Sequence, residues 1–163
     1  MRESFIETLL YLFENYVTKN VPFIDQPENV ILEMMREGYN FRHIKKALNW
    51  LTLFDKKIFN LNLDLKIFGV SQTGIRIYAP EESQKLSPEA KGYLGYLEQL
   101  HIIDTATREL IIHCAMYFSD SLVGLPEIQC ISLLVLHKYP EKCHELKMLE
   151  HLMLFGNYKE MKQ

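Results

Sequence analysis

Apolar side chains recur every three or four residues along most of this chain, which is the spacing of a helix with one buried face. The first such stripe lies within residues 3–18. A second helix is expected to begin near Pro27, a residue suited to a first helical turn, and to stop at Gly38, a residue suited to a left-handed helix end. A third is expected over about 40–57, with Asn40 as its N-cap.

Between residues 61 and 79 the pattern changes to an alternation of apolar and polar positions, the period of a strand with one buried face. The alternating apolar side chains are Leu61, Leu63, Leu65 and Ile67, followed by Ile75 and Ile77. Residues 71–74, SQTG, separate the two runs and have the composition of a turn. The pattern predicts a short β-hairpin over 61–79.

Four more helical patterns follow, and each is bounded by a residue that favours a helix end. The expected starts are Ser87 with Pro88, then Asp104 or Thr105, then Pro126, while Pro140 separates the third helix from the last, which ends at Gly156. The helix that follows Pro126 is apolar nearly all round, so we expect it at the centre of its bundle.

These elements predict a mainly α fold in two parts. Residues 1–80 would form a three-helix lobe that, with its short β-hairpin, resembles a winged helix. Residues 81–163 would form a four-helix bundle packed against that lobe.

Composition and charge narrow the functional classes. The chain is 48% hydrophobic and 12% aromatic, which is ample for a packed interior. Its net charge is −3, and residues 1–66 hold 9 basic and 9 acidic side chains, against 9 and 12 in the remainder. The chain lacks the overall basic field that most nucleic-acid-binding proteins carry, so nucleic-acid binding is not the first interpretation.

The favoured interpretation is a non-enzymatic protein-interaction module. The chain is rich in aromatic residues and methionine, which suit adaptable helix docking. Trp50, Tyr78 and Tyr93 are the candidates for contact with a protein partner. For Trp50 alone, a partly buried place that closes the core under the hairpin is the favoured position, and for Tyr93 the default position is the core.

The second interpretation concerns EGYNFRHIKKALNWL, residues 37–51, a turn followed by a basic amphipathic helix. In a winged helix domain a helix at this place reads DNA. Arg42 and Lys46 would meet phosphates, His43 lies on the same side, and Asn49 is a residue type that recognises adenine. The alternative is an ordinary packed helix, whose solvent face normally carries lysine and arginine.

Catalysis and metal binding find no support in the sequence. GxSxG, P-loop and GxGxxG motifs are absent. His113 and Cys114 are adjacent, and adjacent helical side chains point about 100° apart, so they do not chelate naturally. We therefore expect no enzyme, no catalytic residue, no metal ligand and no cofactor.

The cellular setting is predicted from the cysteines and the hydrophobic runs. Three cysteines cannot form a complete disulfide framework, which is typical of a reducing compartment. The first residues have no uninterrupted hydrophobic core of a signal peptide. No apolar run approaches the roughly 20 residues of a membrane helix. We expect a cytoplasmic protein without membrane association, in an oligomeric state that the sequence leaves open.

Several stretches together carry a family resemblance. They are LLYLFENYV, IKKALNWL, GIRIYAPEE, and KGYLGYLEQLHIID with TRELII. With their order and the total length, they make the chain similar to the bacterial Smg family from end to end. The resemblance implies a cytoplasmic bacterial protein. The family is functionally uncharacterised, so the resemblance assigns no catalytic or ligand-binding residue.

Overall fold

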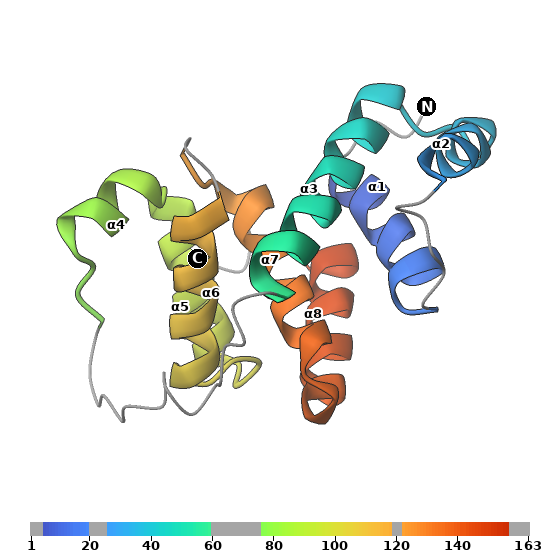
Figure 1. The fold of residues 1–163 in the computed structure, drawn as a ribbon. Helices are drawn as coiled ribbons and strands as arrows, with labels where there is room; N and C mark the ends of the chain where they lie inside the picture. The colour runs from blue at the N-terminus through green and yellow to red at the C-terminus, as the bar shows by residue number, and fades with distance from the viewer. Residues whose placement is uncertain (1–4, 20–25, 60–75, 119–121, 157–163) are drawn as a thin grey trace. The chain divides into compact units, whose positions relative to one another are not determined.

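The structure is a computed structural model of the 163-residue chain, and it describes residues 5–19, 26–59, 76–118 and 122–156. The chain divides into two compact units, Met1–Leu61 and Asn62–Gln163. Figure 1 shows that the described parts of both units are helical. The mainly α fold class predicted from the sequence is therefore confirmed for the described residues.

The first unit is built around its longest helix. α1 (Phe5–Leu12) continues into η1 (Phe13–Val17), a wider π-helical turn, and α2 (Pro27–Arg36) and α3 (Phe41–Phe59) follow. Both α1 and α2 pack on α3 (Figure 1). The core side chains of this unit include Leu9, Leu12, Phe13, Val30, Met34, Ile44, Ala47, Leu48 and Leu51.

The turn between α2 and α3 confirms the helix ends predicted from the sequence. The N–H of Tyr39 donates to the carbonyl of Met34 at 3.1 Å, which closes the end of α2. Gly38 has a φ of 92°, a left-handed conformation that glycine adopts without a steric cost. The Oδ1 of Asn40 accepts the N–H of Arg42 at 2.8 Å and so caps the start of α3.

The second unit is a bundle with one central helix. Its elements are α4 (Pro80–Lys85), α5 (Pro88–Gln99), α6 (Thr105–Phe118), α7 (Leu125–Lys138), the 3-10 turn η3 (Pro140–Lys142) and α8 (Cys143–Phe155). α7 packs against α5, α6 and α8, so the predicted central position of this helix is confirmed. The predicted caps also form: Ser87 Oγ accepts the N–H of Ala90 at 3.1 Å, and Asp104 Oδ1 accepts that of Thr107 at 2.8 Å.

The segment between α3 and α5 differs from its sequence prediction in the hairpin and in an additional short helix. Most of the predicted hairpin, residues 60–75, lies outside the described residues, and no β-strand forms in the part of the chain that the structure describes. The wing of the winged helix is therefore without support. The sequence prediction also missed α4, because this short helix carries no apolar stripe; Pro80 begins it, and Glu82 accepts the N–H of Ala79 at 2.9 Å.

The division between the units falls at 61/62 rather than at the expected 80/81. The physical reason lies in the residues just before α4. Arg76 forms ion pairs with Glu82 and Glu109, and Lys91 of α5 lies over the ring of Tyr78. These contacts attach the segment before α4 to the second unit.

Candidate functional site

One face of α3 in the first unit gathers basic side chains in solvent. Arg42, Lys45, Lys46 and Asn49 are exposed and follow one another at spacings of three, one and three residues. At 100° per residue these four side chains lie within one side of the helix. We call them the basic face of α3. Ile44, Ala47, Leu48 and Leu51 are buried on the opposite side.

The stretch of α3 that carries the basic face holds no acidic residue, and the acidic residue of this helix, Asp55, follows it. Residues 41–54 contain no aspartate or glutamate. The ammonium group of Lys46 lies 4.7 Å from the ring centroid of Phe5, and that of Lys45 lies 5.5 Å from that of Phe41. Cation–π contacts of this kind hold a positive charge at the surface while leaving its other side open to an anion.

Apart from Asp55 on α3, the acidic residues in the described part of the first unit lie on or next to other helices. Glu28, Glu33 and Glu37 are exposed on α2 or directly after it, and Glu33 accepts a hydrogen bond of 2.6 Å from the hydroxyl of Tyr16. Burial of Tyr16, with this neighbouring carboxylate, raises the pKa of the phenol well above its ordinary value. The first unit, residues 1–61, is thus neutral in total, with Arg42, Lys45 and Lys46 gathered on one face of α3.

Two further residues of the sequence hypotheses lie on α3 but not on the basic face. His43 is half-buried, and its Nδ1 is buried without a hydrogen-bond partner among the described residues. Trp50 is half-buried as well. The structure therefore brings Arg42, Lys46 and Asn49 together and sets His43 at their margin.

The other two docking candidates lie in the second unit and are engaged by their own chain. The ring of Tyr78 lies between the guanidinium of Arg76, at 4.7 Å, and the ammonium of Lys91, at 5.3 Å. Burial raises the pKa of Tyr78. Tyr93 is only 1% exposed and belongs to the core, so it offers no surface to a partner and we drop it from the docking set.

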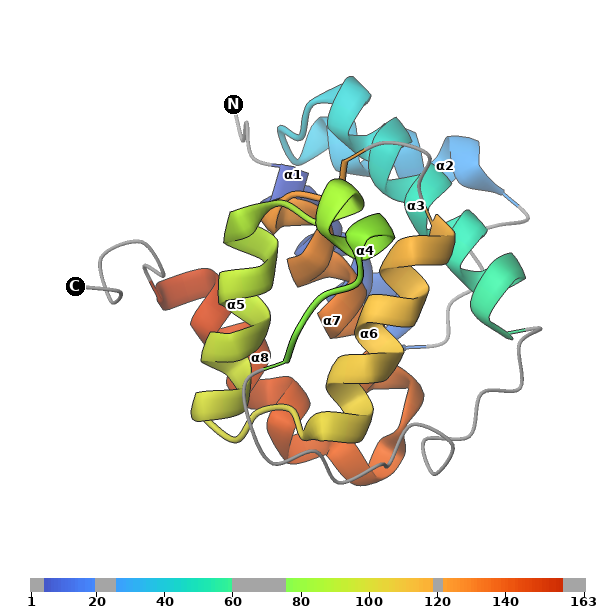
Figure 2. The ribbon, with the colours of Figure 1, turned by 90° about the vertical axis from the view of Figure 1, so that its left-hand side faces the viewer.

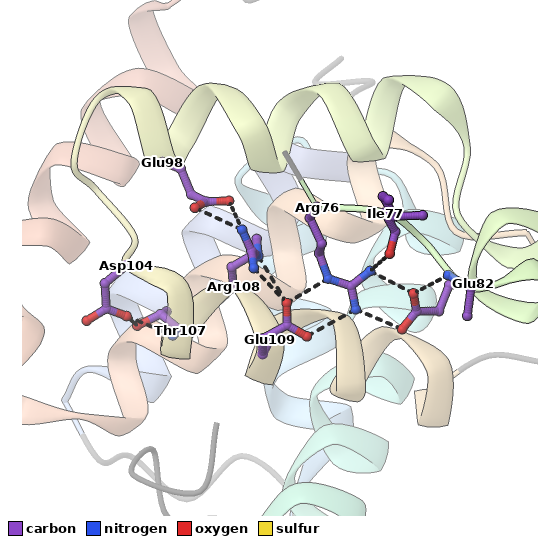
Figure 3. Close-up of polar contacts among 9 residues, drawn as sticks. Arg76, Ile77, Glu82, Glu98, Asp104, Thr107, Arg108 and Glu109 are labelled. Atoms are coloured by element: carbon purple, nitrogen blue, oxygen red, sulfur yellow. Dashed lines mark hydrogen bonds and ion pairs between the residues drawn. The ribbon is translucent and has the colours of Figure 1, made fainter. Parts of the chain in front are cut away.

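A network of arginine and glutamate side chains crosses the second unit (Figure 3). Arg76 donates to both carboxylate oxygens of Glu82, at 2.7 and 3.0 Å, and to both of Glu109, at 2.6 and 3.0 Å. Arg108 donates to Glu98 at 2.8 and 3.1 Å and to Glu109 at 2.9 and 3.1 Å. Glu109 therefore bridges two guanidinium groups.

The network fixes the ionisation of its carboxylates. Burial acts to raise the pKa of Glu109, but hydrogen bonds from Arg76 and Arg108 outweigh it, and the pKa lies below the ordinary value. For Glu82 the hydrogen bonds from Arg76 are the main cause of a lowered pKa. Both carboxylates are therefore held as anions, which suits a structural role and not that of a general acid.

No local sequence pattern predicts this network. A charged side chain is normally expected at the surface of a helix, but that of Arg108 on α6 is buried, with 5% exposure. Arg76 and Glu109 are 33 positions apart, so no helical spacing connects them. Helical spacing would place Glu109 near His113, four residues away on α6, whereas the structure pairs it with arginines.

Other chemistry is sparse in the described residues. No group of three or more histidine, cysteine, aspartate or glutamate side chains there is arranged to hold a metal ion. Cys114 and Cys130 are buried, Cys143 is exposed, and burial raises the pKa of the Cys114 thiol to about 12. Among the helices of the described part, none combines the length and the apolar character needed to cross a bilayer.

Fold and site together define a mainly helical protein whose first unit joins α2 to the basic helix α3 by a short turn and whose second unit carries an arginine–glutamate network. A family model described as a protein of unknown function (DUF494) matches residues 5–161. The chain belongs to this family, which comprises the bacterial Smg proteins, and the resemblance noted from the sequence is confirmed.

Similar proteins cover the chain almost from end to end. A Protein Smg homolog of Alkalilimnicola ehrlichii is 32% identical over 158 residues, 96% of each chain. A Protein Smg homolog of Methylococcus capsulatus is 29% identical over 153 residues, 94% of each chain. One of Alteromonas mediterranea is 31% identical over 150 residues, 90% of this chain and 93% of the relative. No solved structure matches the chain.

Proposed function

We propose that this protein is a non-enzymatic nucleic-acid-binding protein that lays the basic face of α3 against duplex DNA. The observation that carries the proposal is the exposed row of Arg42, Lys45 and Lys46 on a helix without an acidic residue over positions 41–54. The turn at Gly38 joins α2 and α3, and a second helix after a short glycine-containing turn is the arrangement that places a helix in a major groove.

The residue roles follow from their chemistry. Arg42, Lys45 and Lys46 would contact phosphates, which supply most of the affinity for DNA. Asn49 follows Lys46 on the same face, and an amide side chain pairs with an adenine edge. With three phosphate contacts, the logarithm of the binding constant would fall with the logarithm of salt concentration with a slope of about −2.7. Because these contacts are confined to one face of α3, DNA binding does not require a positive net charge of the whole chain.

A protein partner is the second candidate, as the sequence first suggested. It is favoured by large apolar side chains at the surface of α2 and at the start of α3: Leu32 is 56% exposed, Met35 48% and Phe41 44%. Trp50, half-buried on α3, keeps its place in this hypothesis. For either partner we propose a cytoplasmic location, which suits a chain whose three cysteines cannot form a complete disulfide framework.

The test is fluorescence anisotropy of a short labelled DNA duplex, titrated with the full chain at low and at physiological salt. Binding that weakens with salt and is lost in Lys46→Glu would support the proposal. Lys19→Glu is the matched control, because Lys19 is exposed in the same unit but does not lie on α3. Equal loss in both variants would reveal only a general charge effect, and absence of binding at low salt would overturn the proposal in favour of a protein partner.

A further inference from the structure

The residues from Arg76 to Lys85 are attached to the second unit without a buried side chain. None of these ten positions is buried, α4 included, and Ile77 is 91% exposed. The next residue, Leu86, is 1% exposed and marks the point where the chain enters the core. In Figure 2 residues 76–79 cross the outer side of α5 and α6 on their way to α4.

Several polar contacts hold this segment to the second unit, and at its end the N–H of Val123 donates to the backbone carbonyl of Lys85 at 2.7 Å. The guanidinium of Arg76 forms a bidentate pair with Glu109 of α6 (Figure 3). The ammonium of Lys85 donates to the backbone carbonyl of Met116 in α6 at 2.6 Å. Lys91 of α5 lies over the ring of Tyr78.

Further bonds tie the segment to itself. Arg76 also forms a bidentate pair with Glu82, which in turn accepts the N–H of Ala79. Residues 76–85 are therefore one cooperative piece: Arg76 joins the extended part to α4 and both to α6.

A segment fixed by polar contacts at the surface opens at a lower free energy than a segment anchored in a core. We propose that residues 76–85 form a latch, which opens and closes as a unit over α5 and α6 while α5 to α8 stay folded. The Arg76–Glu109 pair holds it shut. The side chain of Arg76 is 14% exposed, and its bonds to two carboxylates are the strong, charge-assisted kind.

Opening the latch changes the surface beneath it. In the closed form Glu109 is shared by Arg76 and Arg108. In the open form Arg76 leaves with Glu82, while Glu98 and Glu109 remain with Arg108 and with Lys91, which loses its contact with the ring of Tyr78. The latch thus uncovers a polar face of α5 and α6 that carries charges of both signs.

The test is hydrogen exchange of the full chain, followed by mass spectrometry. In Arg76→Ala the amides of residues 77–86 are expected to exchange roughly tenfold faster or more, the effect of losing charge-assisted hydrogen bonds. Peptides from α7 are expected to keep the exchange rate of the unmodified protein. Lys142→Ala is the control, because it breaks a pair with Asp104 outside the latch and should leave residues 77–86 unchanged.

Two results would overturn the latch. Unchanged exchange of residues 77–86 in Arg76→Ala would show that the pair does not hold the segment. Equal acceleration in α7 would show that the segment is part of the cooperative bundle.

A second measurement avoids the variant altogether. In the unmodified protein, low urea should hardly change the exchange of residues 77–86, because a local opening exposes little surface, while it accelerates exchange in α7. Equal urea dependence in both regions would contradict the proposal.

Discussion

Arg108 donates from one nitrogen, Nη1, to both carboxylate oxygens of Glu98, at 2.8 and 3.1 Å, and so ties α6 to α5. The guanidinium side chain is 5% exposed, whereas that of Glu98 is 28% exposed. Because one charge of this pair is buried and the other is partly hydrated, removing one partner has a different effect from removing the other. Removing the buried member takes the guanidinium away from Glu98 and leaves Glu109 with Arg76 alone, and removing the hydrated member leaves a guanidinium in a poorly hydrated place.

Arg108→Ala is expected to lower the free energy of unfolding by about 2–4 kcal/mol, toward the range for breaking a buried pair, because Glu98 loses its bonds to the guanidinium and Glu109 keeps only those from Arg76. Urea denaturation followed by circular dichroism measures the effect. The matched control is Lys142→Ala, whose pair with the 56% exposed Asp104 side chain should contribute less than about 1 kcal/mol. Similar losses in the two variants would contradict a special role for the buried arginine.

The turn after α5 contains a residue under backbone strain. His101 has a φ of 58°, its N–H donates to the carbonyl of Glu98 at 3.0 Å, and the N–H of Ile102 donates to that of Leu97 at 3.0 Å. This is the glycine position of a helix end. His101→Gly should therefore raise the thermal midpoint, with a gain of about 0.5–1 kcal/mol. A lower midpoint would show that the histidine side chain contributes more than the strain it imposes.

The corresponding position after α2 is occupied by Gly38, with a φ of 92°. A Cβ added there would meet no atom within 4 Å, so only the backbone conformation opposes a side chain. Gly38→Ala is expected to destabilise the protein by about 1 kcal/mol, the cost of a left-handed alanine. Thermal denaturation measures the change. A neutral result would mean that the α2–α3 turn adopts another conformation.

The acid stability of the protein should depend on Glu82 and Glu109. Their pKa values lie below the ordinary glutamate value of 4.5 in the folded chain, so their contribution to stability is complete above that value. It is lost as the pH falls through the lower, folded pKa values. The urea midpoint, measured from neutral pH downward, should therefore drop below about pH 4.5. In Glu109→Gln the drop should be smaller, and an identical drop would exclude this carboxylate as a cause.

The cysteines should differ in reactivity. Burial raises the pKa of the Cys114 thiol to about 12, which keeps it protonated, and Cys130 is buried too, while Cys143 is exposed. Only a thiolate reacts with iodoacetamide. Labelling of the folded chain at neutral pH should modify Cys143, and modification of Cys114 or Cys130 should require unfolding. Equal labelling of all three would contradict the described core.

The helix ends were predictable because their causes are local. Asn40, Ser87 and Asp104 each cap a helix by accepting a hydrogen bond from a residue two or three positions ahead. Both partners of such a bond lie within one short stretch of sequence, so the cap can be predicted from that stretch alone. The same holds for the apolar helix α7, whose composition alone predicts a central place.

The features that the sequence analysis missed depend on tertiary contacts or on weak patterns. Arg76 meets Glu109 only after α4, α5 and α6 have assembled, so no short window of sequence contains the pair. Tyr93 is a different case. Its spacing from Ala90, Leu94 and Leu97 already placed it on the buried stripe of α5, but a tyrosine suits a surface and a core equally well, and the docking hypothesis chose the surface.

Trp50 is an intrinsic fluorescence reporter for the first unit. It is the only tryptophan in the chain, and it lies half-buried on α3, the helix that carries the basic face. The nine tyrosines emit at shorter wavelengths, so excitation at the red edge of the indole band selects the first unit alone. Binding along α3 should change the indole emission without any added dye, and events confined to the second unit should be silent in that channel.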